Sequence, residues 1–394
     1  MSDGRMAGRR SAMPGAAATT RHGAGMPTVV RRPSHRLVGL ALLACPGLPA
    51  AVPATTAAGD RPADTDAVET LSAIEAARLV EGFPGVEVPV EIFSIGTTSV
   101  ERALPLNGLR DIDAETAAAL SGYRRGPVLL NGLATLSAAA AGRLAQGTAA
   151  KVLFLNGLKR IDAETAAALA GFRGEWLDLN GLERLDPETA RALAEFPGRA
   201  LFLNGLAALD IPTATALGDF RGKLLHLNGL AAIDARTAAA LARFQGVSLF
   251  LNGLERLSAE TAADLAAFRG GLLALNGLRK VEAAALEPLR RFAGARLSVR
   301  GLTSVSAEEA AVLVGIRQWD GTLPACTAFA APDSVTVAAT LAARGDVHLP
   351  NLRRISRQAL AVLRRGEGIV IPPDAELVLI AEPDGSPNDD FAVP

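Results

Sequence analysis

One position of a repeated segment holds aromatic and ionisable side chains that could bind a partner. Each stands between two leucines, as in Leu153-Phe154-Leu155, and this alternation with period two is typical of a short strand with one buried face. The side chains between the leucines would then form one row on the opposite face. Through successive repeats the row reads Phe154, Asp178, Phe202, His226 and Phe250. Aromatic anchors with few charges are typical of the centre of an interface, so this row is a candidate binding strip.

A structural origin of the row is the alternative. Phe recurs at every second repeat, which makes a super-period of 48 residues. Duplication of a block of two repeats would produce that pattern without any ligand. Each ring would then be covered by its neighbours on a crowded face.

Other residues with catalytic or ligating potential form no constellation in the sequence. His226 and His348 are far apart in the repeat order and have no Cys, Asp or Glu at metal-ligand spacing, so we expect no metal site. Cys326 takes the place of a core leucine and is expected to be a buried thiol. The sequence contains no nucleophile elbow, phosphate loop or dinucleotide fingerprint. We therefore expect a protein that is not an enzyme and needs no cofactor, with an enzyme of unknown type as the alternative.

The elements that position these residues come from a repeat of 24 residues. The segment L-N-G-L begins at Leu106, Leu130, Leu155, Leu179, Leu203, Leu227, Leu251 and Leu275. The steps between these starts are 24 residues, except for one step of 25. A fixed period in this range is typical of a solenoid, in which each unit buries its apolar face against its neighbours.

Within one unit the residues predict a strand, a turn, a helix and a return segment. Asn156-Gly157 follows the strand, and both residues tolerate the positive φ of a turn. Asp162 stands at an N-cap position, and Leu169 and Phe172 would be buried positions of the helix. Gly174 and its equivalents in later units would end the helix.

These units predict an α/β fold: a curved right-handed solenoid of strand-turn-helix repeats, with parallel strands on the concave side and helices outside. Strands would pair in consecutive order at about 4.8 Å, whereas helices need about 8 Å or more, so the stack must curve. An all-helical solenoid is the alternative, and the period-two leucines argue against it. Stacked amides at the strand ends would form a structural ladder. Its members are Asn107, Asn131, Asn156, Asn180, Asn204, Asn228, Asn252 and Asn276.

The strand, turn and helix repeated every 24 residues, with L-x-L and a further Leu, resemble the leucine-rich-repeat superfamily. The resemblance covers residues 71 to about 375, and the repeats are similar to Ala- and Gly-Leu-rich repeats of bacterial envelope proteins. The usual order of the superfamily motif is not reproduced, because Asn156 directly follows the strand leucine. Leu158 takes the place where the superfamily has its buried Asn.

The pattern divides the chain into five segments. Residues 1–58 would be a disordered leader with a signal peptide, and 59–103 an N-terminal cap with a helix over 71–83 and a strand-rich part. Regular repeats follow over 104–320, then degenerate C-terminal repeats and a cap over 321–380. Residues 381–394 would be a disordered tail.

The leader predicts export to the periplasm, the cell envelope or the exterior. Arg31 and Arg32 precede the short apolar run 37–45, and small residues follow, as in a secretory signal peptide. A start at Met26 would give this peptide ordinary proportions. Cys45 lies in a segment that resembles a lipoprotein cleavage box, so a lipid anchor at Cys45 is an alternative to free secretion. A cytosolic protein with a low-complexity tail is a third possibility.

The composition limits the class of partner. From residue 59 onward the chain holds 33 basic and 40 acidic residues, a net charge of −7, so a nucleic-acid partner is not expected. A solenoid offers an extended surface, and we expect a monomeric scaffold that binds an unknown protein or glycan. A passive structural protein of the envelope is the alternative. Membrane contact would occur only through a lipid at Cys45.

Overall fold

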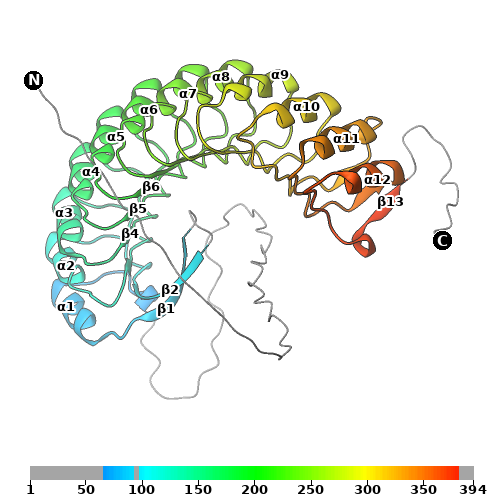
Figure 1. Ribbon diagram of the computed structural model, residues 1–394. Coiled ribbons are helices and arrows are strands. Elements are labelled where there is room, and N and C mark those ends of the chain that lie inside the picture. Colours follow the sequence, from blue (N-terminus) through cyan, green and yellow to red (C-terminus); the bar gives the residue numbers. More distant parts are fainter. Residues whose placement is uncertain (1–64, 93–96, 381–394) are drawn as a thin grey trace, which may run out of the picture. The chain divides into compact units, whose positions relative to one another are not determined.

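The structure, a computed structural model, describes residues 65–92 and 97–380 of the chain. All described residues belong to one compact unit. The leader over 1–58, Cys45 and the tail over 381–394 lie outside the described residues. Within this unit, strands follow the inner side of an arc and helices its outer side (Figure 1).

Strands and helices alternate along the arc. The strands are β1 (Val86–Ile92), β2 (Thr97–Pro105), β3 (Val128–Leu129), β4 (Val152–Phe154), β5 (Trp176–Asp178), β6 (Ala200–Phe202), β7 (Leu224–His226), β8 (Ser248–Phe250), β9 (Leu272–Ala274), β10 (Leu297–Ser298), β11 (Ala328–Phe329), β12 (Arg354–Ser356) and β13 (Val378–Ile380). The α-helices are α1 (Ala73–Gly82), α2 (Ala114–Leu120), α3 (Ala138–Gly147), α4 (Ala163–Ala170), α5 (Pro187–Ala194), α6 (Ile211–Gly218), α7 (Ala235–Leu241), α8 (Ala259–Leu265), α9 (Ala283–Leu286), α10 (Ala307–Gly315), α11 (Ser334–Arg344) and α12 (Arg357–Arg365). The described residues also form the 3₁₀ helices η1 (Thr65–Ala67), η2 (Glu287–Arg291) and η3 (Asp374–Glu376).

The strands pair in the order in which they occur in the chain, from β1 to β10. All pairs from β2 to β10 are parallel, and β1 pairs antiparallel with β2 at the N-terminal end. Equivalent residues lie opposite one another, as in Leu153↔Leu177 and Leu177↔Leu201. This confirms the predicted α/β solenoid with consecutive parallel strands. Beyond β10, β11, β12 and β13 form a second, short parallel sheet.

The helices begin where the N-cap residues predict. The Asp162 carboxylate accepts a hydrogen bond from the Thr165 backbone N–H at 2.8 Å, and Asp or Ser does the same in most other repeats. The Thr165 hydroxyl in turn donates to the Leu136 carbonyl of the preceding repeat at 3.3 Å. The cap residues therefore start each helix, and the threonines tie it to its neighbour.

A column of phenylalanines fills the core between the strands and the helices. Successive rings are nearly parallel, with interplanar angles of 3–6° and centroid distances of 6.0–6.4 Å. That distance lies between the strand spacing of about 4.8 Å and the helix spacing of about 8–10 Å. The column is formed by Phe172, Phe196, Phe220, Phe244 and Phe268, all at most 1% exposed.

The glycines of the repeat have a different role from the predicted one. Gly174 and its equivalents do not end the helices with a positive φ, because the positive-φ residues of the described chain lie elsewhere. α4 already ends at Ala170, and a Cβ on Gly174 would lie 2.1 Å from the Phe172 ring. Gly157 also lacks a positive φ; a Cβ there would lie 2.4 Å from the Asn131 carbonyl oxygen. These positions require glycine because a ring or a neighbouring backbone occupies the space of a side chain.

The Phe column predicts a large difference between two Gly→Ala substitutions. In Gly222→Ala the new methyl group would lie 2.2 Å from the Phe220 ring and 2.8 Å from the Gly198 carbonyl oxygen. We expect it to lower the free energy of unfolding by about 1–3 kcal/mol, the usual cost of overpacking a core. Gly142→Ala in α3 meets only the Ala168 methyl group at 3.9 Å and should raise it by about 0.5–1 kcal/mol. Urea denaturation checks both values, and equal midpoints would contradict this account of the column.

Candidate functional site

The strand register brings the five residues of the candidate binding strip into one row. Phe154 pairs with Asp178, Asp178 with Phe202, Phe202 with His226, and His226 with Phe250. The row crosses β4 to β8 on the inner side of the arc (Figure 1). Alternation with period two along each strand therefore places all five side chains on one surface of the sheet.

The row is not uniformly exposed, contrary to the expectation of free aromatic anchors. Phe202, His226 and Phe250 are 8%, 2% and 9% exposed. The His226 ring stacks between the two phenyl rings, with centroid distances of 4.2 Å to Phe202 and 4.1 Å to Phe250. Stacking on both faces removes the His226 ring from solvent, and each phenyl ring is covered on the face that contacts His226. Phe154 and Asp178 are only partly buried.

His226 is a neutral residue in this environment. Its Nε2 atom is buried and has no hydrogen-bond partner within the described part of the chain. Burial lowers the pKa of His226 from its ordinary value to about 3, because the charged imidazolium would lose its hydration. The side chain is thus part of an aromatic stack and does not act as a proton carrier at neutral pH.

Asp178 interrupts the row of rings with a carboxylate. The Asn156 Nδ2 donates to its Oδ2 at 3.2 Å, and the Asn180 Nδ2 donates to its Oδ1 at 2.5 Å. Burial raises the pKa of Asp178 to about 6, although the hydrogen bonds from both asparagines act in the opposite direction. At neutral pH the group is an anion, and in the described ranges no Lys, Arg or His side chain forms an ion pair with it.

Trp176 is a candidate site residue that the sequence analysis did not identify. It lies on β5 two residues before Asp178, so both side chains share the inner surface of the sheet. The Trp176 side chain is partly exposed, and it pairs with Val152 and Ala200 of the adjacent strands. The same period of two that defined the strip also defines a second row, which contains Trp176. Partly exposed Phe154, Trp176 and Asp178 form the group that we call the β4–β5 cluster.

The asparagines at the strand ends are hydrogen-bonded from repeat to repeat. The side-chain carbonyl of each accepts the backbone N–H of the next asparagine, for example Asn180 from Asn204 and Asn204 from Asn228, both at 2.9 Å. The distances along the whole series from Asn107 to Asn276 are 2.8–3.2 Å. Asp66 provides the acceptor for the Asn107 N–H at one end, and the Arg300 N–H uses the Asn276 acceptor at the other. The amides thus connect backbone and side chain along the inner edge of the sheet.

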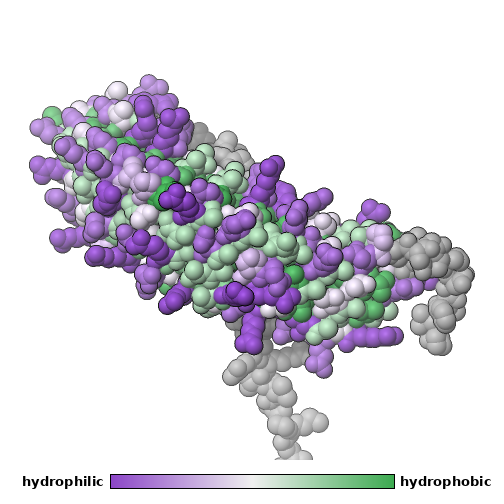
Figure 2. Space-filling view, turned by 90° about the horizontal axis from the view of Figure 1, so that it is seen from above, coloured by the Kyte–Doolittle hydropathy of each residue, from purple (hydrophilic) through white to green (hydrophobic). Residues whose placement is uncertain are grey.

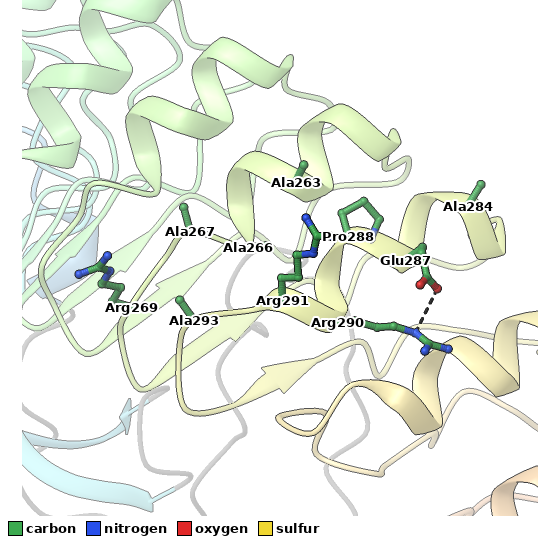
Figure 3. Close-up of a pocket in the computed structure, with 10 residues that line it drawn as sticks. All are labelled: Ala263, Ala266, Ala267, Arg269, Ala284, Glu287, Pro288, Arg290, Arg291 and Ala293. Carbon is green, nitrogen blue, oxygen red and sulfur yellow. Dashed lines mark ion pairs between the residues drawn. The ribbon is translucent and has the colours of Figure 1, made fainter.

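The outer surface has a different chemical character. Seen from above in Figure 2, hydrophobic residues of moderate hydropathy run along the helical side between hydrophilic margins. A groove of about 730 Å³ lies there between α8 and η2 (Figure 3). Alanines such as Ala263 and Ala267 line it, and Arg290 at its margin is paired with Glu287 at 3.0 Å. The groove holds neither Asp178 nor His226.

The remaining candidate residues behave as follows. Cys326 is fully buried, and burial raises the pKa of its thiol to about 11, which makes it unreactive at neutral pH. Within residues 65–92 and 97–380, no group of three His, Cys, Asp or Glu side chains is placed to hold a metal ion. None of the helices in these ranges has the length and hydropathy of a membrane-spanning segment.

The repeated strand–turn–helix unit makes the chain a leucine-rich-repeat-like solenoid. The sequence matches no protein-family model and no curated protein. Similar solved structures include a chain of the TLR13–ssRNA13 complex, with 17% identity, 69% of this chain and 37% of that chain covered, and a TM-score of 0.35. A chain of the Drosophila Toll–Spatzle complex has 12% identity and a TM-score of 0.40, and the match covers 68% of this chain and 40% of that chain. The leucine-rich repeat-containing protein LegL7 from Legionella pneumophila has 13% identity and a TM-score of 0.40, and the match covers 64% of this chain and 84% of that chain. The chain spans less than half the length of the first two.

The asparagine series predicts a loss of stability on truncation. Asn228→Ala would leave the Asn252 N–H, now 2.9 Å from the Asn228 Oδ1, without an acceptor. We expect the free energy of unfolding to fall by about 1–3 kcal/mol, the cost of an unsatisfied donor. Asn351→Ala is the control, because Asn351 is exposed and its amide only donates to Pro324. Urea denaturation of both variants is the measurement, and equal losses would exclude a special role for the series.

The His226 stack predicts a specific dependence of stability on pH. The unfolded state binds a proton near pH 6.5, whereas the folded state resists protonation down to about pH 3. The neutral, buried His226 therefore contributes its full share to the free energy of unfolding above pH 6.5. That contribution decreases as pH falls, by about 2 kcal/mol at pH 5. His226→Phe keeps an aromatic ring and removes this term. The difference in unfolding free energy between wild type and variant, measured at pH 7.5 and pH 5, should change by that amount; a constant difference would contradict the assignment. The Asp178 contribution has the opposite sign and cancels in the comparison.

Proposed function

We propose that this protein is a non-enzymatic binding scaffold that holds a protein partner on the inner surface of its sheet. The observation that supports this is the β4–β5 cluster. Phe154, Trp176 and Asp178 lie on adjacent strands, face the same surface, and are partly exposed, whereas the other rings of the row are stacked and buried. Partly exposed aromatic side chains beside a single charge have the composition of an interaction hot spot.

An enzyme and a passive structural protein are the other candidate functions. Asp178 and His226 both have shifted pKa values, but Phe202 lies between them in the row, so they do not form an acid–base pair. A passive spacer would not need Trp176 and Phe154 partly exposed beside a carboxylate that forms no ion pair among the residues that the structure describes. A glycan remains the alternative ligand for a surface of this composition.

We also propose that the protein works outside the cytoplasm. The proposal rests on the sequence from Arg31 to Ala58, which has the order of regions of a signal peptide. N-terminal sequencing of the protein from its native host is the test. A mature terminus after residue 45 supports free secretion, a lipidated Cys45 supports a membrane anchor, and an intact Met1 or Met26 in the cytosol contradicts export.

Truncation of the β4–β5 cluster should separate binding from folding. Phe154→Ala and Trp176→Ala, each in the full chain, should reduce capture of a partner from envelope extract at least tenfold, as expected for a hot spot worth about 2 kcal/mol. Phe202 and Phe250 are unsuitable for this purpose, because their stacked rings contribute to folding.

The matched control is Ile74→Ala, which truncates an exposed aliphatic residue of α1. Capture is followed by quantitative mass spectrometry, and folding by thermal unfolding. The same partners in the same amounts for wild type and both cluster variants would move the binding surface elsewhere on the solenoid. Loss of capture with Ile74→Ala would point to the helical side.

A further inference from the structure

We propose that the partner presents a cationic side chain, arginine in preference to lysine, to the β4–β5 cluster. The cation would lie against the Asp178 carboxylate and over the Trp176 ring, with Phe154 on the adjacent strand as the second aromatic wall. This inference rests on the proposed function and specifies the chemistry of the partner at that same surface.

The first argument is the charge of Asp178. Its hydrogen-bond donors are the neutral amides of Asn156 and Asn180, at 3.2 and 2.5 Å, and the more distant Asn180 backbone N–H at 3.4 Å. Neutral donors orient a carboxylate without neutralising it. A partly desolvated anion without a counter-ion is unfavourable, and a cation from outside would remove that cost.

Another carboxylate of the chain shows how such a group is normally accommodated. The Asp320 side chain is only 6% exposed, and the Arg300 Nε lies 2.9 Å from its Oδ2. Even the exposed Asp219 is paired, with Arg243 at 3.3 Å. Asp178 differs from both, because in the part of the chain that the structure describes no basic group lies within 4 Å of it. The Asp178 carboxylate can therefore accept a positive charge that residues 65–92 and 97–380 do not supply.

The second argument is the position of the aromatic rings. Trp176 and Asp178 are two residues apart on β5, so their Cα atoms are separated by about 7 Å along one face of the strand. A guanidinium group can lie over an indole ring within about 6 Å of its centroid and still donate two hydrogen bonds to a carboxylate beside it. The chain itself contains this cation–aromatic arrangement, since the Arg344 guanidinium lies 4.7 Å from the centre of the Trp319 ring. A lysine ammonium would reach Asp178 but could not form the bidentate, stacked contact.

The test selects a display library of random 12-residue peptides on the full chain. We expect the enriched peptides to share an arginine or lysine, and a representative peptide to bind in a saturable way. Its affinity should fall at least tenfold when the shared arginine is replaced by citrulline, which keeps the shape and removes the charge. Replacement by lysine should weaken binding by less than citrulline does.

Asp178→Asn is the decisive variant on the protein side. It keeps the shape of the side chain and removes the charge, but it offers one acceptor oxygen in place of two, so one of the two asparagine donors loses its partner. Thermal unfolding verifies that the variant is folded at the temperature of the binding assay. The arginine peptide should bind this variant at least tenfold more weakly, and the citrulline peptide should bind wild type and variant equally. Asp219→Asn is the matched control, because it neutralises an exposed carboxylate of another surface and should leave binding unchanged.

The outcomes separate this inference from the proposed function. Peptides that lack a cation, or whose affinity is unchanged in Asp178→Asn, would overturn the cationic contact. If such peptides still lose binding in Trp176→Ala, the inner-surface scaffold stands. Binding that is unaffected by Trp176→Ala and Phe154→Ala, or a library that yields no binder, would contradict the proposed function and the inference together.

Discussion

Close approach of the backbones of adjacent repeats at the Asn-Gly turn is the constraint on which the rest of the structure depends. A Cβ on Gly205 would lie 2.3 Å from the Asn180 carbonyl oxygen, so only glycine allows this contact. The asparagine before each glycine then joins its side-chain carbonyl to the next backbone N–H at 2.8–3.2 Å. Together the two residues keep adjacent strands of the repeats in the same register. The side chains of equivalent positions therefore lie in straight rows.

The spacing between repeats increases from the inner side of the arc to the outer side. Ring centroids are 4.1–4.2 Å apart in the Phe202–His226–Phe250 stack and 6.0–6.4 Å apart in the Phe172–Phe268 column. The strands between them are spaced at about 4.8 Å, and helices pack at about 8–10 Å. The curvature that helices and strands impose thus compresses the inner side chains. This compression stacks and buries the rings of the row, and it desolvates His226.

Asp178 changes the character of one end of the row. A carboxylate between Phe154 and Phe202 cannot continue the ring stack, so the stack stops at Phe202. Phe154 and Trp176 are left partly exposed beside a carboxylate whose hydrogen-bond donors, within the described ranges, are amides. The inner surface therefore has a buried aromatic part, Phe202 to Phe250, and a partly exposed part that contains Phe154, Trp176 and the Asp178 carboxylate.

The sequence by itself determined the repeat, the consecutive parallel pairing and the membership of the row, because the period of 24 and the alternation of leucines specify them locally. It also determined the N-caps such as Asp162, since a cap depends on residues three apart. Trp176 could have been recognised from the same alternation. Only the tertiary structure decided which members of the row are exposed, why Gly174 is glycine, and that none of the described basic side chains pairs with Asp178. Those properties depend on the distances between repeats. The packing of helices against strands along the whole arc sets these distances, so the sequence of a single repeat does not predict them.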